Sequence, residues 1–252
     1  MTHTEHSDAQ TTKLRTFVPE LKQIRDKQRR KMYEGRIGAI GASPQSRYRL
    51  VGIASCVTLL AVVVASIIHP YVSAAVCLGV VALVAGGWPA ATGVAELRGT
   101  HRIYQHSTII LLSGVVSVGL ALTTPSATRL AMLPLVAAVG IVCSFLVELV
   151  RGEGSKGRLE STISCVTGVL ASVSAAGWVG ISRIYDTPGG ALPILLTGVI
   201  FALLVGLIGL RIISAGPKEG PRRGALTLGV TPVAFIGVVG YTSATFLTYV
   251  LG

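Results

Sequence analysis

Seven long apolar stretches constrain the fold of this chain more than any other feature. Each holds about 20 residues, which is enough for a helix to cross about 30 Å of hydrocarbon. A helix satisfies its own backbone hydrogen bonds in lipid, so we expect a bundle of about seven transmembrane helices, an all-α integral membrane protein. The predicted spans are Leu50–Ile68, Tyr71–Val94, Ser107–Thr123, Leu130–Leu149, Ser161–Ile181, Ala191–Leu210 and Ala225–Leu251.

Composition supports a membrane protein and argues against a soluble one. Only 13% of the residues are charged, against about 25% in an average soluble domain. Apolar residues make up 51% of the chain, more than a soluble core of this size can bury. The net charge of +11 would suit nucleic acid, but the basic residues cluster beside the apolar stretches. We therefore expect a lipid bilayer with anionic headgroups as the partner and no nucleic acid.

The distribution of basic residues predicts the orientation in the membrane. All of the 22 Lys and Arg except Arg129 and Arg183 fall in the N-terminal tail or after the second, fourth and sixth spans. Because basic residues favour the cytoplasmic side, the N-terminus is predicted to be cytoplasmic and the C-terminus extracytoplasmic. A multi-pass protein of the bacterial cell membrane follows. Six spans remain the alternative if the first two, joined at His69 and Pro70, do not form a hairpin.

Residues 1–49 form the predicted cytoplasmic tail, ahead of a bundle at 50–252. Within the tail, Pro19–Glu34 is typical of a helix, with Pro19 suited to its first position and Gly35 to its end. One interpretation is an amphipathic helix that binds anionic lipid or a cytoplasmic protein partner. The other is a solvated helix that only enforces topology. The candidate lipid- or partner-contacting residues are Arg29, Arg30 and Lys31.

The second predicted span ends in an unusual sequence that runs from Gly86 to Pro89. If this span enters from outside at Tyr71, Gly86 lies about 22 Å and Pro89 about 27 Å deep, near the inner interface. Trp88 is expected to anchor that interface, and Pro89 to bend the helix as a hinge. The candidate hinge and cytoplasmic-side polar cluster comprises Gly86, Gly87, Trp88, Pro89, Glu96, Arg98, Glu148, Arg151, Arg158 and Glu160.

The three glutamates of this set also have a simpler interpretation. Glu96, Glu148 and Glu160 stand at cytoplasmic ends of spans, close in sequence to Arg98, Arg151 and Arg158. They could form interfacial ion pairs, or together form a polar cluster that binds a headgroup or a partner.

Residues that carry chemistry are sparse. No charged residue lies in the middle of a predicted span, which argues against an ion-coupled pump. His101 and His106 are five residues apart and have no cysteine nearby, so a metal site is not expected. The G-x-G-x-x-G pattern at 152–157 follows a membrane helix, so it is interpreted as a turn. The four cysteines are expected to be free thiols. We predict no catalytic residue, cofactor or metal.

Small residues recur at every fourth position in the fifth and sixth spans. Such stripes let membrane helices approach closely. We expect them to pack inside the bundle, and the oligomeric state is left open. The residues are Ser164, Gly168, Ser172, Ala176 and Gly180, followed by Gly198, Ala202 and Gly206.

Three segments, 87–89, 145–152 and 158–161, resemble a group of small multi-pass membrane proteins of actinobacteria that are loosely labelled permease. The resemblance spans roughly residues 80–185 and implies transport, without a substrate or catalytic residues. Our main hypothesis is a non-enzymatic accessory or scaffold protein. The alternative is a permease-like carrier of a small or lipidic solute, suggested by the Gly/Pro-broken second span and by Pro134 and Pro232.

Overall fold

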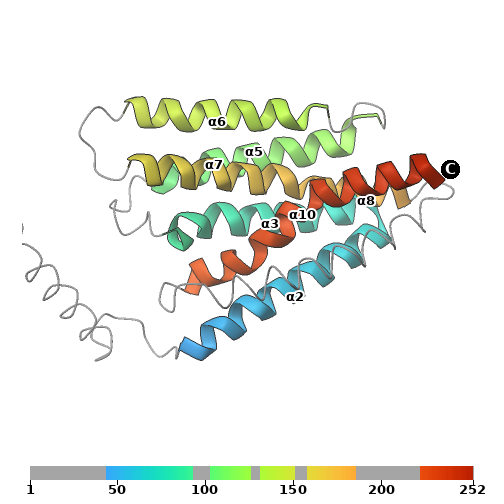
Figure 1. Ribbon diagram of the computed structural model, residues 1–252, viewed down its shortest axis with the longest axis horizontal. Coiled ribbons are helices and arrows are strands. Elements are labelled where there is room, and N and C mark those ends of the chain that lie inside the picture. The colour runs from blue at the N-terminus through green and yellow to red at the C-terminus, as the bar shows by residue number, and fades with distance from the viewer. Residues whose placement is uncertain (1–43, 93–102, 126–130, 151–157, 186–221, 252) are drawn as a thin grey trace, which may run out of the picture. The chain divides into compact units, whose positions relative to one another are not determined.

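The computed structural model describes residues 44–92, 103–125, 131–150, 158–185 and 222–251, and every regular element in these ranges is a helix (Figure 1). Six segments within them are long and apolar enough to cross a membrane. They correspond to the first five predicted spans and the seventh, while Ala191–Leu210 lies outside the described residues. The helices are α2 (Pro44–Ile68), α3 (Pro70–Ala91), α5 (Ile103–Thr123), α6 (Leu133–Val150), α7 (Arg158–Ala175), α8 (Gly177–Tyr185) and α10 (Arg222–Leu251).

The first two spans are separate helices that pack against each other. α2 begins at Pro44, before the predicted boundary at Leu50, and ends at Ile68. His69 alone separates it from α3, and Pro70 occupies the first helical position, where its missing N–H is not needed. The Nδ1 atom of His69 accepts a hydrogen bond from the backbone N–H of Tyr71 at 3.3 Å. His69 therefore caps α3 and closes a helical hairpin.

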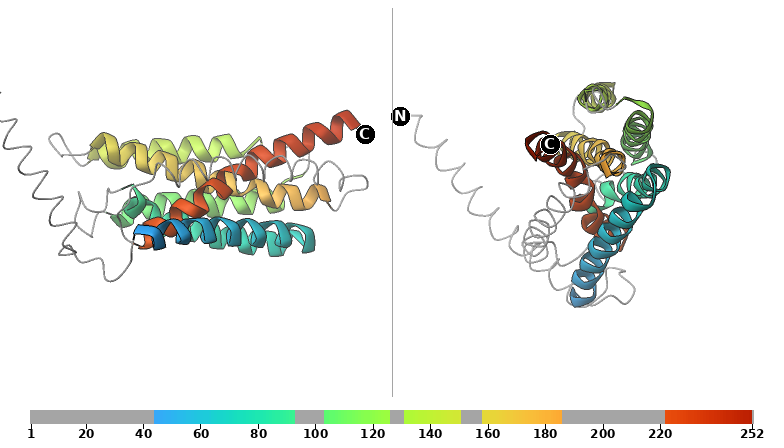
Figure 2. Two further views of the ribbon diagram at one scale, coloured as in Figure 1. Left: turned by 60° about the horizontal axis from the view of Figure 1, so that its bottom comes forward. Right: turned by 90° about the vertical axis from the view of Figure 1, so that its right-hand side faces the viewer.

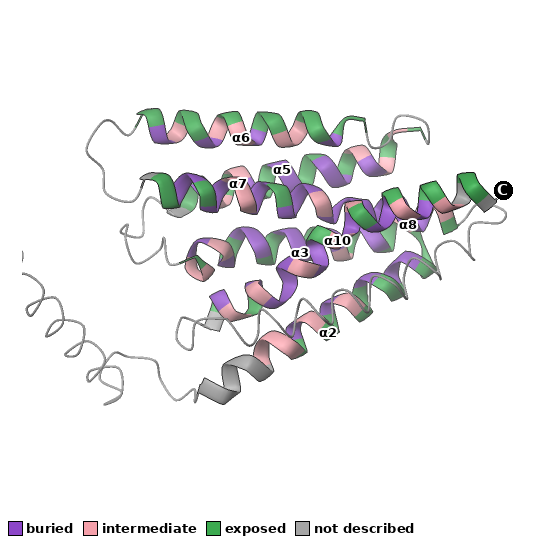
Figure 3. Cartoon of the chain, in the orientation of Figure 1, coloured by how far each residue is buried: buried purple, intermediate pink, exposed green. Residues whose placement is uncertain are grey.

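The fifth predicted span is divided in the structure into α7 and α8, which meet at Ala176. This pair is the most buried of the six candidate spans, and α7 packs against α3, α5, α6 and α10 (Figure 3). Small residues allow this span to occupy the centre of the bundle, because the backbones of neighbouring helices can approach them closely. The five small residues predicted to form a stripe on this span are all buried. The equivalent stripe at Gly198, Ala202 and Gly206 lies outside the described residues.

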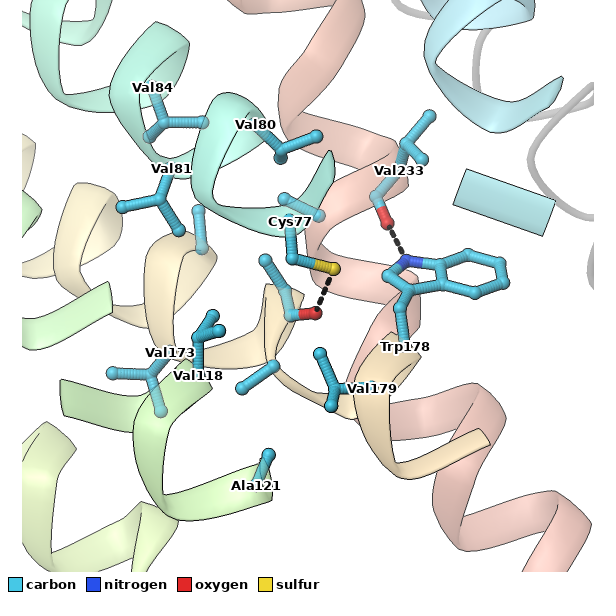
Figure 4. Packing of buried hydrophobic residues seen from close by; sticks show 14 of the residues in the cluster. Cys77, Val80, Val81, Val84, Val118, Ala121, Val173, Trp178, Val179 and Val233 are labelled. Atoms are coloured by element: carbon cyan, nitrogen blue, oxygen red, sulfur yellow. Dashed lines mark hydrogen bonds between the residues drawn. The ribbon is translucent and has the colours of Figure 1, made fainter. Parts of the chain in front are cut away.

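α8 and α10 run in the same direction. Gly177 packs against the backbone of Gly237, and Gly180 packs against the ring of Tyr241 one turn further along. The Nε1–H of Trp178 donates to the carbonyl oxygen of Val233 at 2.9 Å (Figure 4). A side chain at Gly177 would overlap the backbone of α10, so glycine is required at this crossing.

The starts of α2, α5, α7 and α10 and the ends of α3 and α6 lie at one end of the helical bundle, which we call the tail end because residues 1–43 precede α2 there (Figures 1 and 2). Cross-helix contacts establish this arrangement. The hydroxyl of Ser55 donates to Gly229 O at 2.6 Å, which joins α2 to α10. Thr227 Oγ1 lies 3.2 Å from Leu83 O, which joins the start of α10 to the end of α3.

Valine and alanine side chains fill the interior, together with two thiols. Cys77 lies among valines of α3 and its Sγ–H donates to Ala175 O at 3.4 Å (Figure 4). Cys165 is also buried, Cys143 is half-buried and Cys56 is exposed, and all four are free cysteines, as predicted. Short branched side chains permit the close helix spacing that van der Waals packing in a membrane requires.

Candidate functional site

The helix α3 continues without interruption through Gly86, Gly87, Trp88 and Pro89 and ends at Ala91. The sequence suggested a hinge here. The proline is compatible with a continuous helix because it removes only the hydrogen bond to the carbonyl of Ala85, close to the helix end. Thr92 caps the helix, and its N–H donates to Trp88 O at 3.0 Å.

Trp88 bonds to the neighbouring helix α7. Its Nε1–H lies 2.7 Å from Ser164 O and 3.2 Å from Thr167 Oγ1. The hydroxyls of Thr92 and Ser164 are 2.7 Å apart. A Cβ atom at Gly168 would lie only 2.9 Å from Trp88 Cδ1, so the indole occupies the space that this glycine leaves. The polar atom of Trp88 thus joins two helices at the tail end.

Gly87 is buried against the start of α10. A side chain there would overlap Thr227 Oγ1 and would approach Arg223 O to 2.9 Å. Pro89 is also buried, whereas Gly86 is exposed with no atom near its missing side chain. The region that the sequence singled out is therefore a closely packed junction of α3, α7 and α10.

Three side chains from three helices meet beside this junction, and we call them the Glu148 cluster: His106 of α5, Glu148 of α6 and Ser161 of α7. The hydroxyl of Ser161 donates to Glu148 Oε1 at 2.7 Å. His106 Nε2 lies 3.3 Å from the same oxygen and 3.0 Å from Ser161 Oγ. All three residues are buried, with exposed fractions of 3%, 2% and 0% respectively.

Sequence reasoning found only part of this cluster. It placed Glu148 at the inner surface beside Arg151, but the structure buries the Glu148 side chain, and Arg151 lies outside the described residues. His106 was considered only as a metal ligand, and Ser161 only as a span boundary and as part of the segment 158–161 that carries the resemblance. The predicted topology could have brought these residues together. Because α6 runs antiparallel to α5 and α7, its last turn lies at the same end of the bundle as their first turns.

The geometry of the Glu148 cluster does not suit nucleophilic catalysis. In a serine–histidine–carboxylate relay the imidazole lies between its partners and uses a different nitrogen for each. Here the hydroxyl and the carboxylate both approach His106 Nε2, and the hydroxyl donates to the carboxylate. Among the described residues no group of three or more His, Cys, Asp or Glu could hold a metal ion.

None of the other charged residues predicted for the polar cluster is seen in the Glu148 cluster among the described residues. Glu160 lies exposed in the first turn of α7, where a carboxylate is favourable at the positive end of the helix. Arg158 begins α7, and its side chain is not described. Glu96, Arg98, Arg151, Arg29, Arg30 and Lys31 lie outside the described residues.

Comparison with known proteins gives no match to a protein-family model, a curated protein or a solved structure. The described helices have the length and composition of a multi-pass membrane protein.

Proposed function

We propose that this chain is a non-enzymatic accessory or scaffold protein of a bacterial cell membrane, with seven spans, a cytoplasmic N-terminus and an extracytoplasmic C-terminus. Its basic tail and cytoplasmic loops engage anionic headgroups or a cytoplasmic protein. One observation carries this proposal. The helix ends that flank residues 1–43, 93–102 and 151–157 all lie at the tail end, and these segments hold most of the Lys and Arg.

The directions of the helices support an odd number of crossings. α8 ends at Tyr185, opposite the tail end, and α10 begins at Arg222, at the tail end. The apolar stretch Ala191–Leu210, which comes between them in the sequence, is long enough for a transmembrane helix, and we infer that it is the crossing that connects these two ends. Seven crossings then put Gly252 on the side opposite the N-terminus. The basic residues that the sequence places next to the tail-end helix ends support a cytoplasmic location for that side.

Close packing of α3, α5 and α7 favours a scaffold over a carrier. A carrier needs a polar cavity near the middle of the membrane. Gly114 lies in the middle of α5, closer to that depth than Gly86–Pro89. A side chain there would collide with Val81 of α3 and would approach Ser172 of α7 to 3.0 Å, so these three helices are in close contact. Pro134 lies in the first turn of α6, where a proline does not interrupt a helix.

The experiment compares the full chain with a variant in which Arg29, Arg30 and Lys31 are changed to glutamine. Both are purified from native membranes, and co-purifying phospholipids and proteins are quantified by mass spectrometry. We expect the variant to lose retained anionic phospholipid, or one stoichiometric protein, because about 1 kcal/mol per basic residue is at stake near an anionic surface.

The matched control changes Lys13, Arg15 and Arg36 to glutamine, which removes the same charge outside the predicted basic cluster. This control should retain the bound lipid or protein. Unchanged retention in the Arg29–Lys31 variant, or an equal loss in the control, would contradict specific engagement by this cluster.

A further inference from the structure

The helix α6 is attached to the bundle through a narrow line of residues. Only four of its residues are buried, and they recur on one face: Leu133, Gly140, Ser144 and Glu148. Figure 3 shows much of this helix as exposed. The exposed residues with large apolar side chains include Leu135, Val139, Val142, Phe145, Leu146 and Leu149. In a membrane these side chains contact lipid tails, which are as apolar as another helix and give little preference for docking.

The buried line docks α6 by close packing and polar contacts to α5 and α7. A Cβ atom at Gly140 would lie 2.7 Å from both Ser113 Oγ and Val169 Cγ1. The hydroxyl of Ser144 donates to Cys165 Sγ at 3.1 Å. A further polar contact is the Glu148 cluster, where an ionisable side chain of α6 meets His106 and Ser161. Membrane helices are held together mainly by interhelical hydrogen bonds and by the van der Waals packing that small residues permit.

We propose that the Glu148 cluster is a proton-binding site that controls the docking of α6 against α5 and α7. When His106 carries two ring protons, its Nε2–H donates to the Glu148 carboxylate in a charge-assisted bond, which is about twice as strong as a neutral one. When the Nε2 proton leaves to water, the neutral imidazole presents a lone pair to the Glu148 carboxylate, and this hydrogen bond is lost. α6 is therefore held firmly in the protonated state and loosely in the deprotonated one.

The position of the cluster supports proton exchange. His106 lies in the first turn of α5, Ser161 in the first turn of α7 and Glu148 in the last turn of α6. A proton therefore has a short path to the aqueous side at the tail end. The other titratable groups on the packed elements nearby, among the described residues, are the thiols of Cys143 and Cys165 and the exposed side chains of Tyr104 and Glu160.

Native cysteines provide the readout. Cys165 lies at the contact between α6 and α7, Cys77 lies in the core, and Cys56 is exposed on α2. The full chain in lipid nanodiscs is treated with N-ethylmaleimide at about pH 5 and pH 8, the interval in which histidines titrate. Labelling is measured by peptide mass spectrometry. The labelling of Cys165 is divided by that of Cys56 in the same sample to cancel the general rise in thiolate with pH.

We expect the Cys165-to-Cys56 ratio of the wild type to rise about fivefold from pH 5 to pH 8, the factor that one strengthened hydrogen bond provides. His106→Gln and Glu148→Gln should give a high ratio at both pH values. The matched control is His69→Gln, which removes the capping histidine at the opposite end of α3. It should respond to pH as the wild type does.

A constant ratio in the wild type would overturn the proposal, and so would a wild-type pH response in Glu148→Gln. Cys77 monitors the fold, because its labelling should stay low whenever the bundle is intact. If Cys77 is labelled in a variant, that variant is set aside, and the wild type and His69→Gln at the two pH values decide.

Discussion

The hydroxyl of Ser161 on α7 lies 2.7 Å from Oε1 of Glu148 on α6, where both residues are buried. A carboxylate withdrawn from water needs hydrogen-bond donors, and Ser161 supplies one of them from the neighbouring helix. The pair thereby joins the end of one membrane helix to the start of the next.

Changing Ser161 to Ala should destabilise the bundle by about 1–2 kcal/mol, because a buried carboxylate loses one of its hydrogen-bond donors. The free energy of unfolding can be measured by denaturation with sodium dodecyl sulfate in mixed micelles. The control is Thr108→Val, which removes an exposed hydroxyl that bonds only within its own helix, to Tyr104 O. Equal stability of Ser161→Ala and the wild type would contradict a structural role for the Ser161–Glu148 contact.

The neighbouring glycines Gly86 and Gly87 should respond oppositely to alanine. Gly87→Ala places a methyl group against Thr227 and Arg223 O, and such overpacking costs about 1–3 kcal/mol. Gly86→Ala meets no atom within 4 Å and gains helix propensity, so stability should stay unchanged or rise by up to about 1 kcal/mol. Thermal unfolding in detergent compares the two. Similar effects of both substitutions would show that α3 and α10 are not in contact at Gly87.

Trp88→Phe should lower the free energy of unfolding by about 1 kcal/mol, because the bond from Nε1 to Ser164 O is lost while the aromatic ring is largely kept. Tyr104→Phe is the control, since Tyr104 is 67% exposed at the same end of the bundle. Denaturant titrations of both variants test this. If Trp88 only anchored the interface, the two substitutions would have equally small effects.

Arg183 closes the opposite end of α5. Its Nη1 lies 3.2 Å from Ala121 O, 2.8 Å from Leu122 O and 2.9 Å from Thr124 O. A cation at the negative end of a helix contributes about 0.3–1 kcal/mol. Arg183→Gln should lower stability by about this amount, and Arg183→Lys by less, because lysine retains the charge. Equal losses in the unfolding free energy of the two variants would show that the charge contributes nothing.

The proposed topology predicts where a reporter fused to the C-terminus is active. Alkaline phosphatase joined after Gly252 should be active in a bacterial host, because it folds only outside the cytoplasm. Fusion within 151–157 should be inactive, since this loop is predicted to be cytoplasmic. An inactive fusion after Gly252 would mean an even number of crossings.

Six of the helical spans followed from the length of the apolar stretches, because a helix that crosses lipid has a minimum length. The structure moved their ends: α2 begins at Pro44, α3 begins at Pro70, and the fifth span is divided at Ala176. His69 caps the start of α3, and Gly177, directly after the division at Ala176, packs against Gly237 of α10, a contact that the local sequence does not reveal.

The candidate site was predictable only as a set of unusual residues. The sequence directed attention to Gly87, Trp88 and Glu148, but it could not name their partners Thr227, Ser164 and His106. Each partner comes from another helix. Which helices become neighbours depends on how their small residues fit together.

The sequence by itself determined that the described spans are helices of membrane-crossing length, since lipid offers no alternative partner for the backbone. It also determined where glutamate, tryptophan and histidine occur along them. Only the tertiary structure decided that Glu148 lies inside, bound to Ser161 and His106, and that Gly87 touches α10. The physical reason is that hydropathy distinguishes lipid from water, whereas helix pairing depends on close contacts between particular small and polar side chains.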